Sequence, residues 1–213
     1  MTKKHEHIAP PQIAGRTTGA TASEECSNRT EAIALYRSAC QRLFDVNHWY
    51  EHTGESVLSA KFQLTDPNGN PVDRKPQEGD FIRIDLPAPG LESGDGYDWV
   101  QIESLQECDT NFESDYDFCA IRVRPAPNPT DDSDETAHFY TELASSTFTI
   151  SREGNEVIAK ETGRNEIPNN KDNEEVKDTV RNTFIAETAS RGLAWPQWKV
   201  LMEGLLKQEK HEE

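Results

Sequence analysis

The stretch STFTISREGNEVIAKE, residues 146–161, carries the clearest secondary-structure signal in the chain. Apolar and polar residues alternate on both sides of the turn Glu153-Gly154-Asn155, and Gly and Asn are favoured residues in β-hairpin turns. Such alternation is typical of strands that bury one face and expose the other. The sequence therefore predicts an antiparallel hairpin here and favours an antiparallel sheet around it.

The same period of two recurs upstream of this hairpin. It predicts further strands over residues 57–64, 80–86, 97–107 and 116–124, and a segment over 137–142 that either extends the first hairpin strand or forms a short strand of its own. Turns and stiff connectors rich in Gly, Pro, Asn and Asp separate these segments. Together with the hairpin, they make a sheet of about six strands.

Helical patterns flank the strand region on both sides. Asn28 and Glu31 form a variant of the capping box, and apolar residues follow at helical spacing to about Val46. A second helical pattern covers 176–191, and a last helix is expected to begin at Pro196. Its apolar stripe consists of Trp198, Leu201, Met202 and Leu205. This order predicts an α+β fold, in which a curved antiparallel sheet packs against an N-terminal helix and C-terminal helices.

In element order the chain resembles the helix-grip, or START-like, superfamily, in which a curved sheet wraps a long C-terminal helix. The resemblance spans residues 29–206, and no sequence motif accompanies it. The first strand of that fold, which precedes its first helices, has no counterpart among the predicted elements, and Gly192 interrupts the C-terminal helix. The resemblance implies a fold and leaves the activity open.

Composition divides the chain into three parts. Residues 1–27 are rich in Thr, Ala, Gly and Pro without periodicity, which predicts a flexible N-terminal arm. Residues 28–206 form a single predicted α+β domain, and residues 207–213 a charged tail.

Charge and hydropathy exclude several classes of function. With 22 basic and 39 acidic residues, the net charge is −17, so phosphate repels the chain and we expect no nucleic-acid partner. No apolar run is long enough for a membrane span, and no signal peptide is legible, so a cytoplasmic location is expected. The negative charge fits either a basic partner or adaptation to high salt.

The four cysteines form no CxxC pair, so reduced structural thiols are expected rather than a metal or redox site. His48 and His52 have the i, i+4 spacing of metal ligands, but no third ligand is specified. Asp95 and Asp98 occupy a glycine-rich loop that lacks the spacing of a calcium motif. We therefore predict no bound metal and no cofactor.

The sequence also contains no complete set of catalytic residues. His138 is the one histidine of the strand region, and no nucleophile elbow or phosphate-binding loop accompanies it. Arginines on predicted strands form either an anion-binding row or cross-strand ion pairs with carboxylates such as Glu103. They are Arg83, Arg122 and Arg124, with Arg164 after the hairpin. We assign no catalytic residue and lean against an enzyme.

Two hypotheses of function follow from these patterns. The first is a non-enzymatic interaction or assembly protein, which docks to a protein partner or to itself. Its contacts would be Ile8 and Ile13 in the arm and Trp195 and Trp198 near the C-terminus.

The alternative is a helix-grip-like binding module or enzyme, which holds a small apolar ligand in a cavity between the sheet and the C-terminal helix. The residues expected to line that cavity are Phe62, Ile84, Trp99, Phe118, Phe148 and Phe184.

Overall fold

A seven-stranded antiparallel sheet organises the computed structural model, which describes residues 8–53, 60–85, 94–108, 114–169 and 195–207. The strand order is β1-β7-β6-β5-β4-β3-β2, so only the pairing of β1 with β7 joins segments distant in sequence. The strands are β1 (Arg16–Glu25), β2 (Lys61–Thr65), β3 (Phe81–Asp85), β4 (Asp98–Gln106), β5 (Tyr116–Pro125), β6 (Ser145–Glu153) and β7 (Glu156–Glu166).

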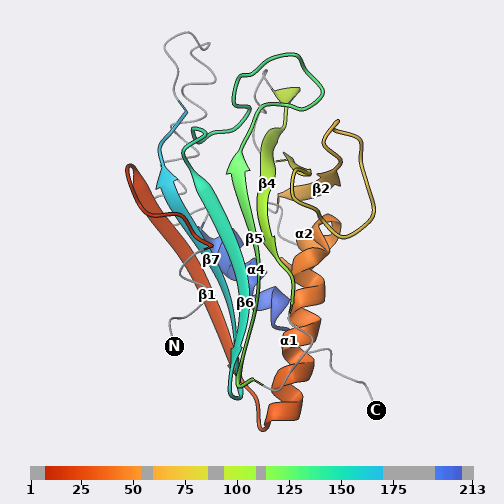
Figure 1. Cartoon of the computed structure of the whole chain (residues 1–213), viewed down its shortest axis with the longest axis vertical. Helices are drawn as coiled ribbons and strands as arrows, with labels where there is room; N and C mark the ends of the chain where they lie inside the picture. Colours follow the sequence, from red (N-terminus) through yellow and green to blue (C-terminus); the bar gives the residue numbers. More distant parts are fainter. Residues whose placement is uncertain (1–7, 54–59, 86–93, 109–113, 170–194, 208–213) are drawn as a thin grey trace.

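The helices cover one face of this sheet (Figure 1). They are α1 (Arg29–Phe44), the 3-10 turn η2 (Val46–His48), the short α2 (Trp49–His52) and α4 (Trp195–Leu205). Helix α1 packs on β5, β6 and β7, whereas α4 packs on β1 and β7 and also contacts α1 and α2. The α+β class and the antiparallel sheet are therefore as the sequence predicts. No helix in the described part of the chain is long and apolar enough to cross a membrane.

The beginning of α1 confirms the predicted cap. The Asn28 side-chain oxygen accepts the backbone N–H of Glu31 at 3.0 Å, and the Glu31 carboxylate accepts the N–H of Ser27. This arrangement pairs N–H groups at the helix start that lack partners within the helix. The whole predicted apolar face of α1 is buried, namely Ala32, Tyr36, Ala39, Cys40, Leu43 and Phe44.

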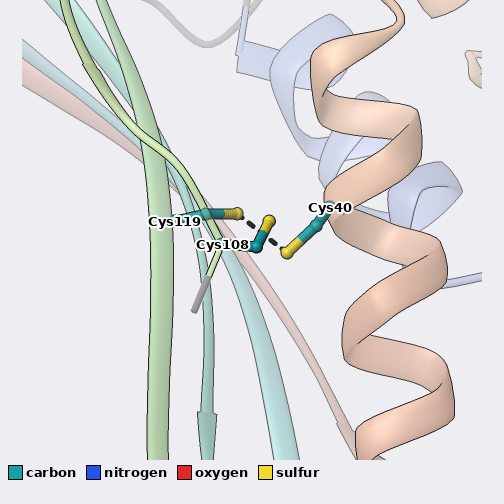
Figure 2. Close-up of side chains that lie close together, drawn as sticks. All are labelled: Cys40, Cys108 and Cys119. Atoms are coloured by element: carbon teal, nitrogen blue, oxygen red, sulfur yellow. Dashed lines mark hydrogen bonds between the residues drawn. The ribbon is translucent and has the colours of Figure 1, made fainter. Parts of the chain in front are cut away.

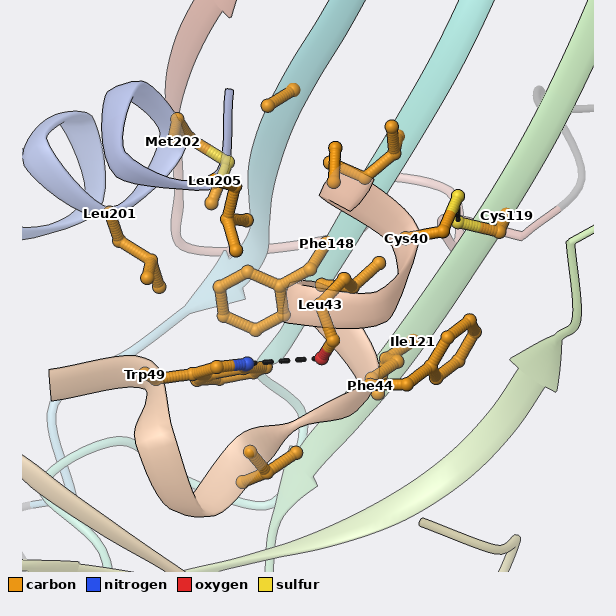
Figure 3. Packing of buried hydrophobic residues seen from close by; sticks show 14 of the residues in the cluster. Cys40, Leu43, Phe44, Trp49, Cys119, Ile121, Phe148, Leu201, Met202 and Leu205 are labelled. Atoms are coloured by element: carbon orange, nitrogen blue, oxygen red, sulfur yellow. Dashed lines mark hydrogen bonds between the residues drawn. The ribbon is translucent and has the colours of Figure 1, made fainter. Parts of the chain in front are cut away.

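The core lies between the sheet and these helices. Trp49 fills its centre, where its indole N–H donates to the carbonyl of Leu43 at 3.0 Å (Figure 3). Its ring contacts those of Phe62 and Phe148, with centroids 5.3 and 5.0 Å apart. Leu201, Met202 and Leu205 of α4 close the layer and are fully buried, as their helical spacing predicts.

The largest difference from the sequence prediction concerns the N-terminus. Residues 16–25, expected within a flexible arm, form the edge strand β1. This strand is the first strand of the helix-grip order, which the sequence did not reveal. Its residues are mostly small and polar, and only Ala20 is fully buried, so the apolar alternation of a strand is missing. Backbone pairing with β7 along nearly its whole length holds it in place, together with the contact of Ala20 with the core.

A second difference concerns residues 137–142, which form no regular strand. Tyr140 makes an isolated bridge to Pro168, and the ring of Phe139 stacks on that of His138 and lies tilted against that of Tyr140. The predicted hairpin is confirmed, with Glu153 opposite Glu156 and a left-handed Gly154 (φ 62°) at the turn. The helix predicted over 176–191 lies outside the described residues.

Candidate functional site

Alternation along the strands separates the helix-covered face of the sheet from its outer face. Ala159 of β7 is buried in the core, so Glu161, two residues further on, points to the same face. In the register of the sheet, Glu161 lies opposite Phe148 of β6 on one side and Ala20 of β1 on the other. The fold thus places a carboxyl group among apolar side chains, on the face that α4 covers.

Glu161 is only 1% exposed, and neither of its carboxylate oxygens has a hydrogen-bond partner among the described residues. Glu166 is 7% exposed, and one of its oxygens accepts a hydrogen bond from the Thr18 hydroxyl at 2.7 Å. Its other oxygen is also buried without a hydrogen bond within the described chain. An unpaired buried polar atom costs about 1–3 kcal/mol, and native proteins contain few of them. The two glutamates therefore mark a candidate binding site.

A backbone irregularity brings Glu166 to the same face as Glu161. Asn165 adopts a left-handed conformation (φ 54°), which breaks the alternation of the strand just before Glu166. The Glu166 side chain then folds back over Gly163, where an added Cβ would collide with its Oε1. Any side chain at position 163 would push this carboxyl group out of the site.

The electrostatics of the pair follow from its burial. Burial raises the pKa of Glu161 to about 8, and the neighbouring Glu166 is the second cause of this rise. The Ser146 hydroxyl acts in the opposite direction and lowers the pKa. Burial also raises the pKa of Glu166, which the Thr18 hydrogen bond opposes. Both carboxyl groups add to the effect of burial in raising the pKa of Tyr140. At neutral pH Glu161 is mostly protonated, so it can both donate and accept a hydrogen bond.

The six residues predicted to line a cavity do not all meet. Phe62, Ile84 and Phe148 belong to the core on the helix-covered face, where Phe62 and Phe148 contact the Trp198 ring. Trp99 and Phe118 lie on the outer face of the sheet and not on the predicted side, because they alternate with the core residues of β4 and β5. Phe184 lies outside the described residues.

The residues predicted to bind a partner are in part used within the molecule. The Ile8 carbonyl accepts a hydrogen bond from Arg122 at 2.7 Å, and the backbone N–H of Ile13 donates to Asn165 at 2.6 Å. The Ile13 side chain is 81% exposed. Trp198 is half-buried against the core, and Trp195 is the first residue of α4. Docking through these residues stays a prediction.

The other predicted chemistry lies apart from the glutamates. His48 is at hydrogen-bond distance from Asp45 (2.8 Å), which raises its pKa, whereas burial lowers the pKa of His52. Asp98 is fully buried at the start of β4. His138 Nδ1 accepts the backbone N–H of Tyr140, a structural role.

Ion pairs engage two of the four arginines of the predicted row. Glu103 binds both Arg122, at 3.0 Å, and Arg124, as the cross-strand alternative predicts. Arg83 instead stacks on the Tyr97 ring, 4.5 Å from its centroid.

A cavity of about 920 Å³ lies on the outer face, between residues 8–12 and strands β5, β6 and β7. Tyr116 and Phe118 stack on one another along its wall, and Lys160 and Arg164 line it together with Arg122. Hydroxyl-bearing side chains of β6 make up much of the remaining lining. This cavity too contains a buried polar atom without a hydrogen-bond partner among the described residues, the hydroxyl of Thr147.

Within the described residues, the order of one strand, helices, six strands and a helix, with the helices on one face of an antiparallel sheet, is that of the helix-grip fold. No family model matches the chain, and no curated protein matches it.

Among solved structures, the chain is similar to the di-domain aromatase/cyclase BexL of the BE-7585A biosynthetic pathway, with 12% identity and a TM-score of 0.39 over 90% of this chain. It spans about half (51%) of that protein. It is similar as well to the ZhuI aromatase/cyclase from Streptomyces sp. R1128, with 8% identity and a TM-score of 0.42, over 89% of this chain and 93% of that one. For norcoclaurine synthase from Thalictrum flavum the identity is 8%, the TM-score 0.42 and the coverage 91% and 87%. Because these TM-scores lie below 0.5, the fold assignment rests on the chain's own elements.

Sequence reasoning missed the glutamate pair. Glu161 was placed at the end of the hairpin, and its alternation with Val157 and Ala159 did signal that it points inward. No sequence signal could have brought in Glu166, because its orientation depends on the left-handed Asn165.

Proposed function

We propose that the protein binds a small, largely apolar molecule on the helix-covered face of its sheet, with Glu161 hydrogen-bonding to one polar group of that molecule. The observation that carries this proposal is the burial of Glu161 among core side chains without a hydrogen-bond partner among the described residues. Ligand sites in proteins are mostly apolar and contain a few well-placed polar groups, and this arrangement has that composition.

The protonation of Glu161 narrows the ligand class. A buried carboxyl group with a pKa of about 8 presents one O–H donor and one carbonyl acceptor at neutral pH. A hydroxyl group on the ligand matches both, because it donates one hydrogen bond and accepts another. We therefore expect an apolar molecule with a hydroxyl group rather than a strongly anionic one, which the neighbouring Glu166 would repel.

A pair of matched probes tests this proposal. 2-Naphthol has an aromatic body and one hydroxyl, and 2-methoxynaphthalene has the same body without the donor. Isothermal titration of the full chain is expected to show that 2-naphthol binds about 10-fold more tightly, the ratio for about 1.4 kcal/mol of hydrogen bonding. The Glu161→Leu variant should bind both probes alike.

The exposed Glu24 on β1 supplies the control, since Glu24→Leu should keep the preference for 2-naphthol. Equal binding of the two probes by the wild-type chain would refute the role of Glu161. A preference that survives in a folded Glu161→Leu variant would do the same. Circular dichroism establishes that the variants are folded.

A further inference from the structure

Three of the four cysteines meet at one point of the fold (Figure 2). Cys40 extends from α1, Cys119 from β5, and Cys108 from the chain just after β4. Their three sulfur atoms all lie within 4.8 Å of one another, and the sulfurs of Cys40 and Cys119 are 2.8 Å apart. These residues are 68 and 11 positions apart along the chain, so the fold and not a local motif assembles the thiol cluster.

The geometry points to a metal site: we propose that Cys40, Cys108 and Cys119 bind a thiophilic divalent ion of the Zn²⁺ type. Zinc binds thiolate sulfur at about 2.3 Å, which puts the sulfurs of a tetrahedral site roughly 3.8 Å apart. The present cluster needs only a small adjustment to reach that spacing, mainly a widening of the Cys40–Cys119 separation. Three protein ligands leave a fourth position for water, as in open zinc sites.

The surroundings of the cluster are suited to such an ion. Cys40 and Cys119 are 3% and 0% exposed, so two ligands are held rigidly in the core. Cys108 is only partly buried, and an ion and its fourth ligand can arrive from that side.

The charge balance favours a divalent ion. Binding releases the thiol protons, and three thiolates around Zn²⁺ leave a net charge of −1 in place of three separate negative charges. Soft sulfur ligands select zinc over the hard ions calcium and magnesium.

Cobalt substitution tests the proposal on the full chain, reduced and freed of metal with a chelator. Co²⁺ should produce thiolate-to-cobalt charge-transfer absorption, and Zn²⁺ should displace the cobalt stoichiometrically. Cys108→Ala, the variant least harmful to the core, should lose this absorption. It should also weaken zinc binding more than about 100-fold, because a lost ligand costs more than the 10–100-fold of a lost supporting group.

Cys26, the remaining buried cysteine, provides the matched control, since it lies outside the cluster. Cys26→Ala should bind both metals as the wild type does. Failure of the reduced wild-type chain to bind Co²⁺ and Zn²⁺ would overturn the proposal, as would unchanged binding by Cys108→Ala. If the protein isolated without reductant contains a Cys40–Cys119 disulfide and its reduced form binds no zinc, the proximity of these sulfurs belongs to a disulfide instead.

Discussion

Arg152 on β6 is a fully buried charged residue, and all three nitrogens of its guanidinium donate hydrogen bonds. Its guanidinium binds the equally buried Asp117 of β5 through Nε at 2.6 Å. It also donates to the carbonyls of Gly154 and Ser114, both at 2.7 Å. The pair therefore ties β5 and β6 together beside the hairpin turn.

Removing Arg152 should be among the most damaging single changes in the chain. Arg152→Ala leaves the Asp117 charge buried without its partner, which costs about 3–5 kcal/mol in the free energy of unfolding. The exposed pair Arg29–Asp115, 2.8 Å apart, serves as comparison, and Arg29→Ala should cost less than about 1 kcal/mol. Urea unfolding measures both, and equal losses would contradict this ranking.

Glu161 should give the stability of the protein an unusual pH dependence. Its pKa is about 8 in the folded chain and about 4.3 in the unfolded chain, so between these values only the folded state retains the proton. The contribution of Glu161 to the free energy of unfolding should thus be most favourable below about pH 4.3. It should fall as the pH rises toward 8. The slope is at most about 1.4 kcal/mol per pH unit.

Urea unfolding between pH 5 and pH 8 measures that slope. Glu161→Gln, which cannot ionise, should flatten it, and Glu24→Gln at an exposed position of β1 should not. If Glu161→Gln and the wild type show the same pH dependence, the carboxyl group is already ionised in the folded state.

At the scale of elements, β1 distinguishes the observed architecture from an arm followed by a domain. It pairs with β7 along nearly its whole length and contacts α4, so it covers the edge of the sheet next to the glutamate site. In the absence of β1, β7 would become an exposed edge, which is prone to pairing with other chains.

A charge placed on the buried side of β1 tests its role in the fold. Ala20 is 2% exposed and lies opposite Glu161, so Ala20→Asp buries a carboxylate beside a carboxyl group that is already unpaired. We expect a loss of about 3 kcal/mol or more in the free energy of unfolding. Ser23→Asp, on the exposed side of the same strand, should change it by less than about 0.5 kcal/mol. Similar values for the two variants would place β1 outside the cooperative fold.

At the scale of the whole molecule, the net charge of −17 acts against compactness through self-repulsion. Added salt screens this repulsion, because the Debye length falls from about 30 Å at 0.01 M to about 3 Å at 1 M. The melting temperature should therefore rise with NaCl concentration over this range. Calorimetry with NaCl at constant pH measures the shift, with an uncharged osmolyte at matched osmolality as control. A constant or falling melting temperature would show that local ion pairs outweigh the net repulsion.

The oligomeric state of the whole molecule tests the hypothesis that the protein is an interaction or assembly protein. The N-terminal segment from Ile8 to Ile13 makes hydrogen bonds to the chain's own sheet, through Arg122 and Asn165. Size exclusion with light scattering on the full chain tests assembly directly. A stable higher-order complex would support the hypothesis that the protein docks to itself or to a partner. A monomer would contradict self-assembly and favour the ligand-binding proposal.

The sequence by itself determined the elements whose signal is local. The cap at Asn28, the hairpin around Gly154 and the alternation of β2 to β5 all depend on residues within a few positions of one another. Hydrophobic period and turn chemistry are enough to identify such elements.

Tertiary structure alone decided the rest. The sequence of β1 has too few apolar residues to predict a strand. The segment becomes a strand because the edge of β7 offers hydrogen-bond partners for its backbone. The glutamate pair depends on one left-handed residue, and the thiol cluster depends on a helix, a strand and the segment just after β4, which meet across the core. Contacts between residues far apart in sequence leave no local pattern, because the free energy that favours them arises only after the chain has folded.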